Sequence, residues 1–249
     1  MKHFNQAIAL TIAVITSLTL TNKPGFSQSH GGHHSAPTRT AVPEISPTDR
    51  QAEAYVNQGL NKLHKKDYKG AIASFTQAVE LQPKHYIAYT YRGDIRRLTG
   101  DYQGAVEDYT SAIAQNPNHS YLHNSRGISY AALGNYQKAV ADHTQAIEVY
   151  PEEGAGYRHR GAMYFKLGEN EKALDDLEQA LIRNQNDAEA YTYRGEVQAK
   201  LGNVKAALAD YEKAANSFAA QSNKVGYNKA TNLAKTLQQT TPSASTTNK

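Results

Sequence analysis

Cysteine is absent from the sequence. This absence excludes disulfides, thiolate metal sites, thiol nucleophiles and a lipid-modified amino-terminal cysteine. The chain also lacks a glycine-rich phosphate loop, a His-Glu metalloprotease pair, a Gly-x-Ser-x-Gly elbow and a calcium loop. Carboxylate pairs do occur, as in Asp175-Asp176 and Glu152-Glu153, but they fall at predicted helix surfaces or turns, which is typical of solvated side chains. We therefore predict a protein that is not an enzyme and needs no cofactor.

A surplus of positive charge is also missing from the main part of the chain. The formal net charge is +4, but residues 52–221 contain 19 Lys and Arg against 21 Asp and Glu. The basic excess therefore lies in the two tails. A basic face for DNA or RNA is disfavoured, because nucleic-acid binding depends on clustered Lys and Arg that neutralise phosphates.

The first 27 residues have the features of an export signal. A short polar start precedes an apolar run of 14 residues at 7–20, and Gly25-Phe26-Ser27 offers small residues for cleavage after Ser27. The run is shorter than the about 20 residues that a membrane-spanning helix needs. We predict a signal peptide at residues 1–27 and an exported protein in the periplasm, a thylakoid lumen or the extracellular space. The alternative is an uncleaved anchor, which would make the protein a membrane-tethered scaffold.

Residues 28–48 are predicted to form a disordered linker rich in His, Ser and Pro. They contain too few aliphatic residues to offset the entropy of ordering. The linker holds His30, His33 and His34, whose simplest interpretation is a polar tail without a metal. If cleavage follows Ser27, the amino-terminal amine, two backbone nitrogens and the His30 imidazole would suit Cu(II) or Ni(II). Binding of Cu, Ni or Zn by this tail, with the rest of the chain as a docking module, is therefore kept as an alternative function.

Most of the remaining chain repeats a 34-residue pattern. Apolar residues follow helical spacing at positions 1–14 and 17–30 of each copy, and glycine stands at position 15 of four copies, where a helix would end. Each copy is therefore predicted to form a helix, a tight turn and a second helix. Glycine also holds position 8 of all five copies at a cost of about 1 kcal/mol relative to Ala, so we expect close backbone contact there. The five copies are residues 52–85, 86–119, 120–153, 154–187 and 188–221.

The pattern of aromatic, Gly, Tyr, Ala, aromatic, Ala and Pro at positions 4, 8, 17, 20, 24, 27 and 32 resembles the tetratricopeptide repeat family. The aromatic positions are expected to be core, and His143 at position 24 is expected to be a packed, hydrogen-bonded histidine. The resemblance covers residues 52–221 and implies a right-handed superhelix of helix pairs whose first helices line a concave groove for a peptide or partner helix. Gln185 and Ala219 depart from the family's Pro, and Asn170 and Val204 from its Tyr. The variant with Tyr-Arg-Gly in the first helix is similar to repeats of photosynthetic bacteria.

The fold prediction is therefore an all-α, right-handed superhelical solenoid of five helix-turn-helix units with a carboxyl-terminal capping helix. The array with its cap spans residues 49–239, where the segment Ser222 to Gln239 keeps apolar residues on one face. Residues 240–249 form a polar tail that we predict to be disordered.

Position 7 is arginine and position 23 is aspartate in copies two to five, whereas copy one has Gln58 and Ser74. Both partners are lost together, and a helical hairpin brings the two positions close. We therefore predict a structural ion pair within each of the four copies, in preference to a row of anion-binding arginines. The pairs are Arg92 with Asp108, Arg126 with Asp142, Arg160 with Asp176 and Arg194 with Asp210.

The partner-binding groove is predicted at positions 2, 5, 6, 9 and 12 of the first helices. Aromatic, amide and mixed-charge side chains there suit an extended peptide or another protein. The predicted groove residues are Asn57, Tyr91, Asp94, Arg97, Tyr121, Asn124, Ser125, Arg158, His159, Glu189, Tyr193 and Glu196.

The family's chaperone-binding subgroup uses Lys, Asn and Arg at such positions to clamp a carboxylate. Here the matching positions hold other residue types, so we expect no carboxylate clamp for a chaperone tail. They are Val56, Leu60, Tyr91, Tyr121 and Ser125. The predicted function is an exported, non-enzymatic interaction scaffold that assists the assembly of a complex.

Overall fold

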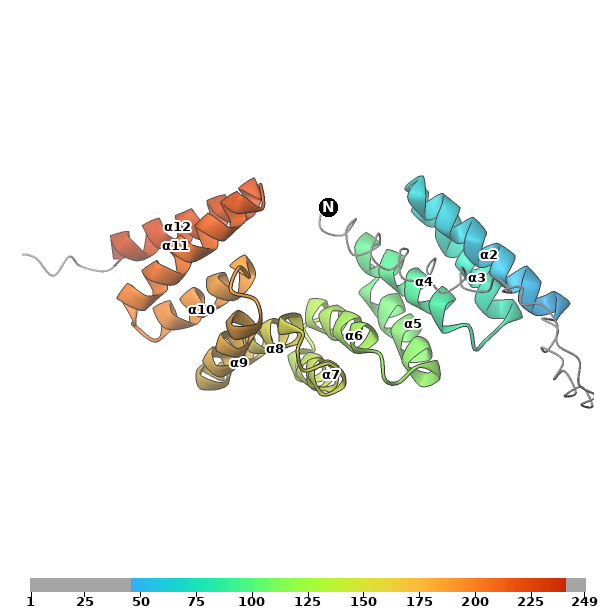
Figure 1. Ribbon diagram of the computed structural model, residues 1–249, viewed down its shortest axis with the longest axis horizontal. Helices are drawn as coiled ribbons and strands as arrows, with labels where there is room; N and C mark the ends of the chain where they lie inside the picture. The colour runs from blue at the N-terminus through green and yellow to red at the C-terminus, as the bar shows by residue number, and fades with distance from the viewer. Residues whose placement is uncertain (1–45, 241–249) are drawn as a thin grey trace, which may run out of the picture. The chain divides into compact units, whose positions relative to one another are not determined.

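The computed structural model describes residues 46–240. The predicted signal peptide, the histidine-containing linker except its last residues, and the tail from residue 241 onward lie outside the described residues. Within the described range the chain forms helices and no strand, which confirms the all-α prediction. The helices are α2 (Pro47–His64), α3 (Tyr68–Leu81), α4 (Tyr86–Thr99), α5 (Tyr102–Gln115), α6 (Ser120–Ala132), α7 (Tyr136–Val149), α8 (Gly154–Leu167), α9 (Asn170–Arg183), α10 (Ala188–Lys200), α11 (Val204–Ala220) and α12 (Lys224–Thr240) (Figure 1).

Consecutive helices pack as pairs, and each pair packs on the next. The tightest partners are the two helices of one repeat, such as α2 with α3 and α4 with α5, and the second helix of each repeat also packs on the first helix of the next. The colours of Figure 1 follow this order from α2 to α12. This is the packing of a helical solenoid, in which each unit buries its apolar faces against its neighbours.

The turn inside four of the five repeats is fixed by a glycine in the left-handed region. Gly100 ends α4 with φ of +89°, and its N–H bonds to the carbonyls at the end of that helix. In the first repeat Lys66 takes this place with φ of +61°. In the first two repeats the second helix then begins with a side-chain cap, as where the Asp101 carboxylate accepts a hydrogen bond from Gly104 N at 2.9 Å, whereas α7, α9 and α11 begin without one. The left-handed residue after the first helix is therefore the feature that all five hairpins share.

The glycine at position 8 makes a different contact from the one that the sequence predicts. A Cβ added to Gly195 would lie 2.7 Å from Tyr211 Cε1, and one added to Gly59 would lie 2.8 Å from Phe75 Cε1. The space is therefore taken by the side chain at position 24, and the expected backbone contact is secondary: at Gly195 the added Cβ would lie 3.3 Å from the nearest backbone oxygen. Glycine is needed here because the side chain at position 24, which is a ring in four copies and Leu177 in the fourth copy, packs against the first helix.

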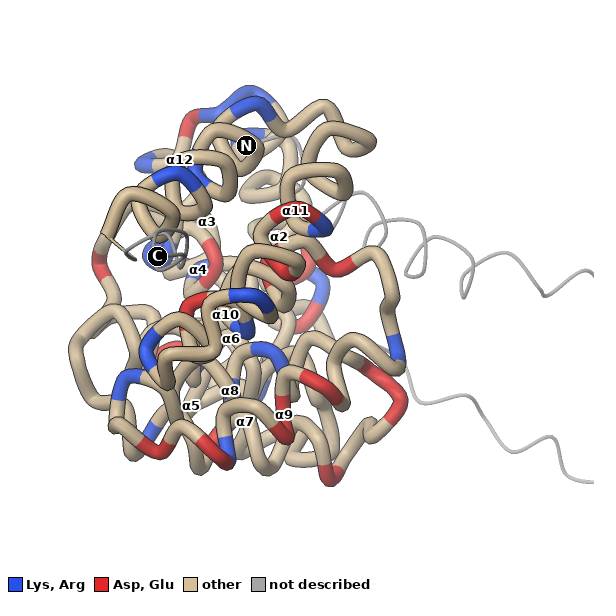
Figure 2. The backbone as a smooth tube through the Cα atoms, turned by 90° about the vertical axis from the view of Figure 1, so that its left-hand side faces the viewer, with Lys and Arg blue, Asp and Glu red and all other residues tan. Residues whose placement is uncertain are grey.

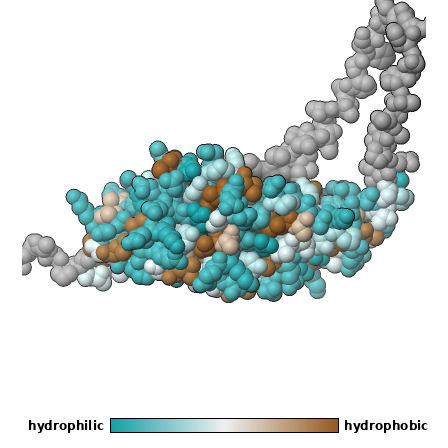
Figure 3. Space-filling view, turned by 90° about the horizontal axis from the view of Figure 1, so that it is seen from below, coloured by the Kyte–Doolittle hydropathy of each residue, from teal (hydrophilic) through white to brown (hydrophobic). Residues whose placement is uncertain are grey.

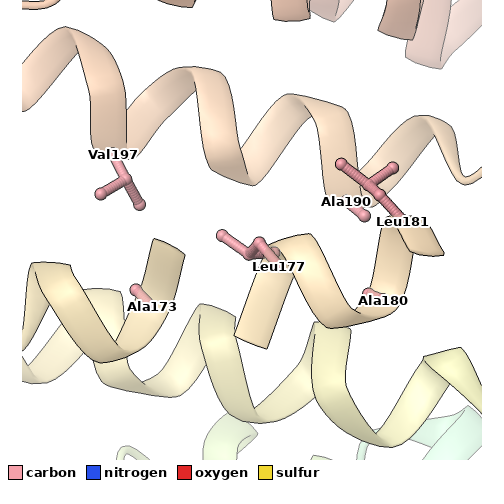
Figure 4. Close-up of a cluster of buried hydrophobic side chains, with 6 residues drawn as sticks. All are labelled: Ala173, Leu177, Ala180, Leu181, Ala190 and Val197. Carbon is pink, nitrogen blue, oxygen red and sulfur yellow. The ribbon is translucent and has the colours of Figure 1, made fainter. Parts of the chain in front are cut away.

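The core consists of alanines at the helix crossings with larger side chains between them. Between α9 and α10 the side chains of Leu177, Leu181 and Val197 interlock around small residues (Figure 4). Full burial of one such aliphatic side chain is worth about 1.5–3 kcal/mol. Ala173 and Ala180 are fully buried in the same cluster and let the helices approach closely.

The surface of the array carries mixed charge and few apolar residues. Figure 2 shows Lys and Arg interspersed with Asp and Glu along the helices. Apolar residues are scattered among hydrophilic ones on the face seen in Figure 3. At the carboxyl end α12 buries Gly226 and Ala230 and covers Phe218 of α11, so the last apolar face is closed by the predicted cap.

Candidate partner-binding surface

The first helices of the repeats form one layer of the array. In this layer α4 touches α6, α6 touches α8, α8 touches α10 and α10 touches α12. The second helices of consecutive repeats make no comparable contact within residues 46–240. In a curved stack the layer whose members lie closer together is the inner one. The first helices therefore line the concave side, where the sequence places the groove.

A polar cluster at the contact of α4 with α6 is built around Asp94. One oxygen of this buried carboxylate accepts hydrogen bonds from Tyr109 Oη at 2.7 Å and from Tyr121 Oη at 2.6 Å. Burial raises the pKa of Asp94, while the two hydroxyls and the nearby Arg97 lower it. Arg97 Nε in turn donates to Tyr109 Oη at 3.2 Å. Asp94 thus joins the two helices of its own repeat to the first helix of the next.

Two histidine rings stack on each other further along this face. The rings of His143 and His159 lie 5.3 Å apart with an angle of 22° between their planes. His143 Nδ1 donates to Asn124 Oδ1 at 3.0 Å. Burial lowers the pKa of His143 to about 3, with a smaller contribution from the arginines Arg160 and Arg158. Burial also lowers the pKa of His159 well below its usual value, so both imidazoles are neutral at pH 7.

The guanidinium of Arg158 is matched by two carboxylates at the start of α10. Its Nη1 lies 2.6 Å from Asp187 Oδ2, and its Nε lies 3.4 Å from Glu189 Oε2. Asp187 also caps α10 by accepting a hydrogen bond from Ala190 N at 3.0 Å. Arg158 therefore serves the junction between two repeats and offers no unpaired charge to an anionic ligand.

The capping helix contributes to the same face at its far end. Lys229 Nζ lies 3.1 Å from Glu196 Oε1 and 5.6 Å from the centre of the Tyr193 ring. A lysine over an aromatic ring is favourable by about 0.5–1 kcal/mol at an exposed site. The concave side thus continues from the first helices of the repeats onto α12.

The residues predicted for the groove differ in exposure. Tyr91, Asp94, Asn124 and Ser125 are buried, and the Tyr91 ring stacks on Phe75 with 5.6 Å between centroids. The sequence places them on the inner face by position, but the packing of neighbouring helices covers them. The other eight form the accessible part of the surface, where Asn57 and Glu189 are exposed and the remaining six are half-buried. The eight are Asn57, Arg97, Tyr121, Arg158, His159, Glu189, Tyr193 and Glu196.

The structure brings together the two residues of every predicted Arg–Asp pair. The four carboxylate side chains are 2–8% exposed, so each ion pair is largely withdrawn from water. Their shortest N···O distances are 2.6 Å for Arg92 with Asp108, 2.7 Å for Arg126 with Asp142, 2.8 Å for Arg160 with Asp176 and 2.7 Å for Arg194 with Asp210.

Three of these arginines also reach back to the preceding repeat. Arg92 Nη1 donates to Thr76 Oγ1 at 3.0 Å, and Arg126 Nη1 makes the same bond to Thr110 at 3.1 Å. Arg160 repeats it with the threonine at position 25 of the third copy. The guanidinium thus links two repeats while it pairs with an aspartate inside one.

The first repeat replaces the ion pair with a hydrogen bond between two neutral side chains, next to the ammonium of Lys62. Ser74 Oγ donates to Gln58 Oε1 at 3.0 Å and accepts a hydrogen bond from Lys62 Nζ at 3.0 Å. Gln58 and Ser74 therefore take the places of the Arg and the Asp.

Sequence comparison alone missed the contacts between copies. The histidine stack joins position 24 of one copy to position 6 of the next, and Asp94 bonds position 2 of the next copy. The recurrence of threonine at position 25 in three copies is a signal that could have revealed the link made by the arginines.

The part of the chain that the structure describes contains no cluster of three or more His, Asp or Glu side chains arranged to hold a metal ion. His30, His33 and His34 lie outside it. Among the helices between residues 46 and 240, none is both long and apolar enough to cross a membrane.

The helix pairs, their 34-residue register and their inner layer define a helical-repeat protein of the solenoid class. Models of the tetratricopeptide repeat match residues 56–120, 120–153 and 161–202, which together make up more than half of the chain. The chain therefore belongs to the tetratricopeptide repeat family. No curated protein matches it.

Solved structures share this fold at low sequence identity. MamA is 19% identical with a TM-score of 0.63, and the match covers 70% of this chain and 96% of MamA. YrrB, described as a TPR protein with an unusual peptide-binding site, is 18% identical with a TM-score of 0.60 over 76% of this chain and 99% of YrrB. TTC0263, a thermophilic TPR protein from Thermus thermophilus, is 23% identical with a TM-score of 0.57 over 72% and 98%. At these identities the likeness concerns the fold alone.

Proposed function

We propose that the protein is an exported, non-enzymatic scaffold that docks a peptide or partner protein on the concave side of its array and so assists the assembly of a complex. Proteins of this repeat family are generally interaction scaffolds. The similar fold of YrrB is described with a peptide-binding site, which supports peptide binding as the mode of interaction.

One observation carries the proposal: the accessible side chains of the inner layer combine aromatic rings, amides and charges that are already balanced. Arg158 is matched by Asp187, and Lys229 by Glu196. A ligand therefore gains affinity mainly from stacking and from hydrogen bonds, which suits an extended peptide. We expect affinity that depends little on salt, unlike binding to nucleic acid or to an acidic chaperone tail.

Site-specific photo-crosslinking tests the proposal. A photoreactive phenylalanine analogue at Asn57, Glu189 or Tyr193 should crosslink the partner, because these side chains are accessible on first helices. The same analogue at Glu80 or Gln145, which are exposed on second helices, is the matched control. Equal crosslinking from both sets, with purified protein and the isolated partner, would refute docking on the concave side.

The export part of the proposal depends on residues 1–27 alone. Mass spectrometry of the protein purified from its host should show a mature chain that begins after the signal. A full-length chain that stays with the membrane fraction would instead support the uncleaved anchor, and a full-length chain in the cytoplasm would refute export.

A further inference from the structure

A hollow of about 500 Å³ lies between α9, α10 and α11. It is lined by the guanidinium of Arg194, by aliphatic Leu174 and Ala209, and by the carboxylates of Asp175 and Glu178. Its volume falls within the about 300–1,000 Å³ that is typical of ligand pockets. The other repeats show what usually fills this place.

In the fourth repeat the corresponding arginine is covered by two tyrosines. The guanidinium carbon of Arg160 lies 5.8 Å from the centre of the Tyr157 ring and 5.9 Å from that of Tyr164. The ammonium of Lys172 then lies 5.3 Å from the Tyr164 ring. Arginine, tyrosine and lysine thus form a stack over the ion pair.

The second and third repeats cover their ion pairs with other residues of the same helical positions. In the third, the Tyr130 ring lies 6.0 Å from Arg126 and carries Lys138 at 5.3 Å. In the second, Arg96 takes the tyrosine's place and lies 3.0 Å from Asp108. A large side chain at position 11 is therefore the rule in these three repeats.

The fifth repeat lacks this cover. Position 11 is Gln198 and position 19 is Ala206, where the fourth repeat has its tyrosine and lysine. Gln198 Oε1 accepts a hydrogen bond from Asn203 Nδ2 at 2.7 Å, so its amide is engaged by the turn. Arg194 keeps one ring, that of Tyr191 at 5.6 Å, and the place of the second ring is the hollow.

The polar groups at the hollow also lack the partners found elsewhere. The threonine that accepts a hydrogen bond from the other three arginines is replaced by Glu178, and no hydrogen bond from Arg194 Nη1 is formed within residues 46–240. Glu178 and Asp175 are exposed, and neither lies within 4.0 Å of a cationic side chain in the same range, although the charge of Glu178 helps to raise the pKa of Arg194. Lys213 is held 5.4 Å from the Tyr191 ring. The hollow therefore offers one open guanidinium face and an excess of carboxylate.

We infer that this hollow binds a tyrosine side chain of a partner protein, with a lysine next to it in the partner's sequence. The ring would lie over Arg194 as Tyr164 lies over Arg160, and the ammonium would face Glu178 and Asp175. Each cation–ring contact is worth about 0.5–2 kcal/mol, depending on how far it is desolvated. This second site shares α10 with the concave surface but is lined by other residues of that helix.

Binding can be measured with the dipeptide N-acetyl-Tyr-Lys-amide and the full chain. We expect saturable NMR shifts of the Ala209 methyl at millimolar dipeptide, because only two side chains supply the affinity. N-acetyl-Leu-Lys-amide and N-acetyl-Tyr-Glu-amide should bind several-fold more weakly, since each loses one of the two contacts. Equal shifts with all three, or none with any, would overturn the inference.

A variant that fills the hollow with the side chains found in the fourth repeat is the decisive control. Gln198→Tyr with Ala206→Lys restores the residues of the fourth repeat, so it should keep the fold and weaken dipeptide binding at least tenfold. Asn216→Tyr, at an exposed site elsewhere on α11, should leave binding unchanged. A filled variant that binds the dipeptide as well as the wild type would refute the site. Tyr193→Ala should reduce crosslinking on the concave side and leave dipeptide binding unchanged.

Discussion

Replacing Arg126 with glutamine tests whether the row of arginines is structural. Arg126 Nη2 and Nε donate to the two oxygens of Asp142 at 2.7 and 2.8 Å, and the aspartate side chain is only 7% exposed. Removal of the arginine leaves this carboxylate buried without its counterion. Loss of one partner of a buried pair costs about 3–5 kcal/mol, mostly because the remaining charge is uncompensated. We expect the lower end, about 3 kcal/mol, since glutamine still donates one hydrogen bond.

The first repeat supplies the matched control. There Gln58 and Ser74 form a neutral hydrogen bond in the same place. The double variant Arg126→Gln with Asp142→Ser should therefore cost only about 1 kcal/mol, because no buried charge is left. The coupling between the two sites is then about 2 kcal/mol or more, within the range for residues in contact.

Urea unfolding of the full chain measures these differences. With a slope of about 1–3 kcal/mol per molar urea, a loss of 3 kcal/mol lowers the midpoint by roughly 1–3 M. The single variant should unfold well before the double variant, with unchanged slopes. If both unfold at the same urea concentration, or if the single variant unfolds with the wild type, the pair is not a buried structural element.

Three further predictions concern individual side chains. In the wild type, the pKa of His143 is about 3 in the folded chain and about 6.5 in the unfolded chain, so the free energy of unfolding falls as the pH drops from 6.5 towards 3. At pH 4 this loss is about 3 kcal/mol, and His143→Phe should remove it. Equal losses in both proteins on acid titration would contradict this. Gly195→Ala should destabilise by about 1–3 kcal/mol in thermal melts, since the new Cβ would lie 2.7 Å from Tyr211, and a higher melting temperature would refute the packing argument. Tyr121→Phe should lower the free energy of unfolding by about 1.5 kcal/mol. It should also raise the pKa of Asp94 further, because the hydrogen bond from the Tyr121 hydroxyl lowers that pKa in the wild type. Carboxyl-carbon NMR measures this pKa, and an unchanged value would mean that the hydrogen bond is not formed.

The helices follow closely from the sequence because two local signals agree. The 3.6-residue apolar period and the glycine at position 15 place the first helix at positions 1–14 and the second at 17–30, and α4 (Tyr86–Thr99) and α5 (Tyr102–Gln115) occupy those positions. The Arg–Asp pairs could be inferred for the same reason, since both residues belong to one hairpin whose geometry is fixed by a short turn.

Contacts between repeats could not be inferred in this way. Whether Tyr91 and Asn124 are accessible depends on the angle between successive repeats, which no residue within one copy determines. The stack of His143 on His159 likewise requires the second helix of one copy to face the first helix of the next. A glycine at position 8 shows that space is needed but does not show which group occupies it. For Gly195 the sequence predicts a backbone contact, whereas in the structure the Tyr211 ring lies nearest.

The first and the fifth repeat both depart from the pattern around the Arg–Asp pair, but for different reasons. No second helix precedes α2 within residues 46–240, so an arginine at position 7 of the first repeat would lack the threonine that the other repeats provide. A neutral Gln58–Ser74 pair avoids burying a charge with incomplete hydrogen bonding. The fifth repeat is different, because α9 does precede it and still offers Glu178 in place of threonine. There the charged pair is kept, its cover is removed, and the arginine is left with an open face. An end effect does not account for this combination, whereas an aromatic side chain supplied by a partner does.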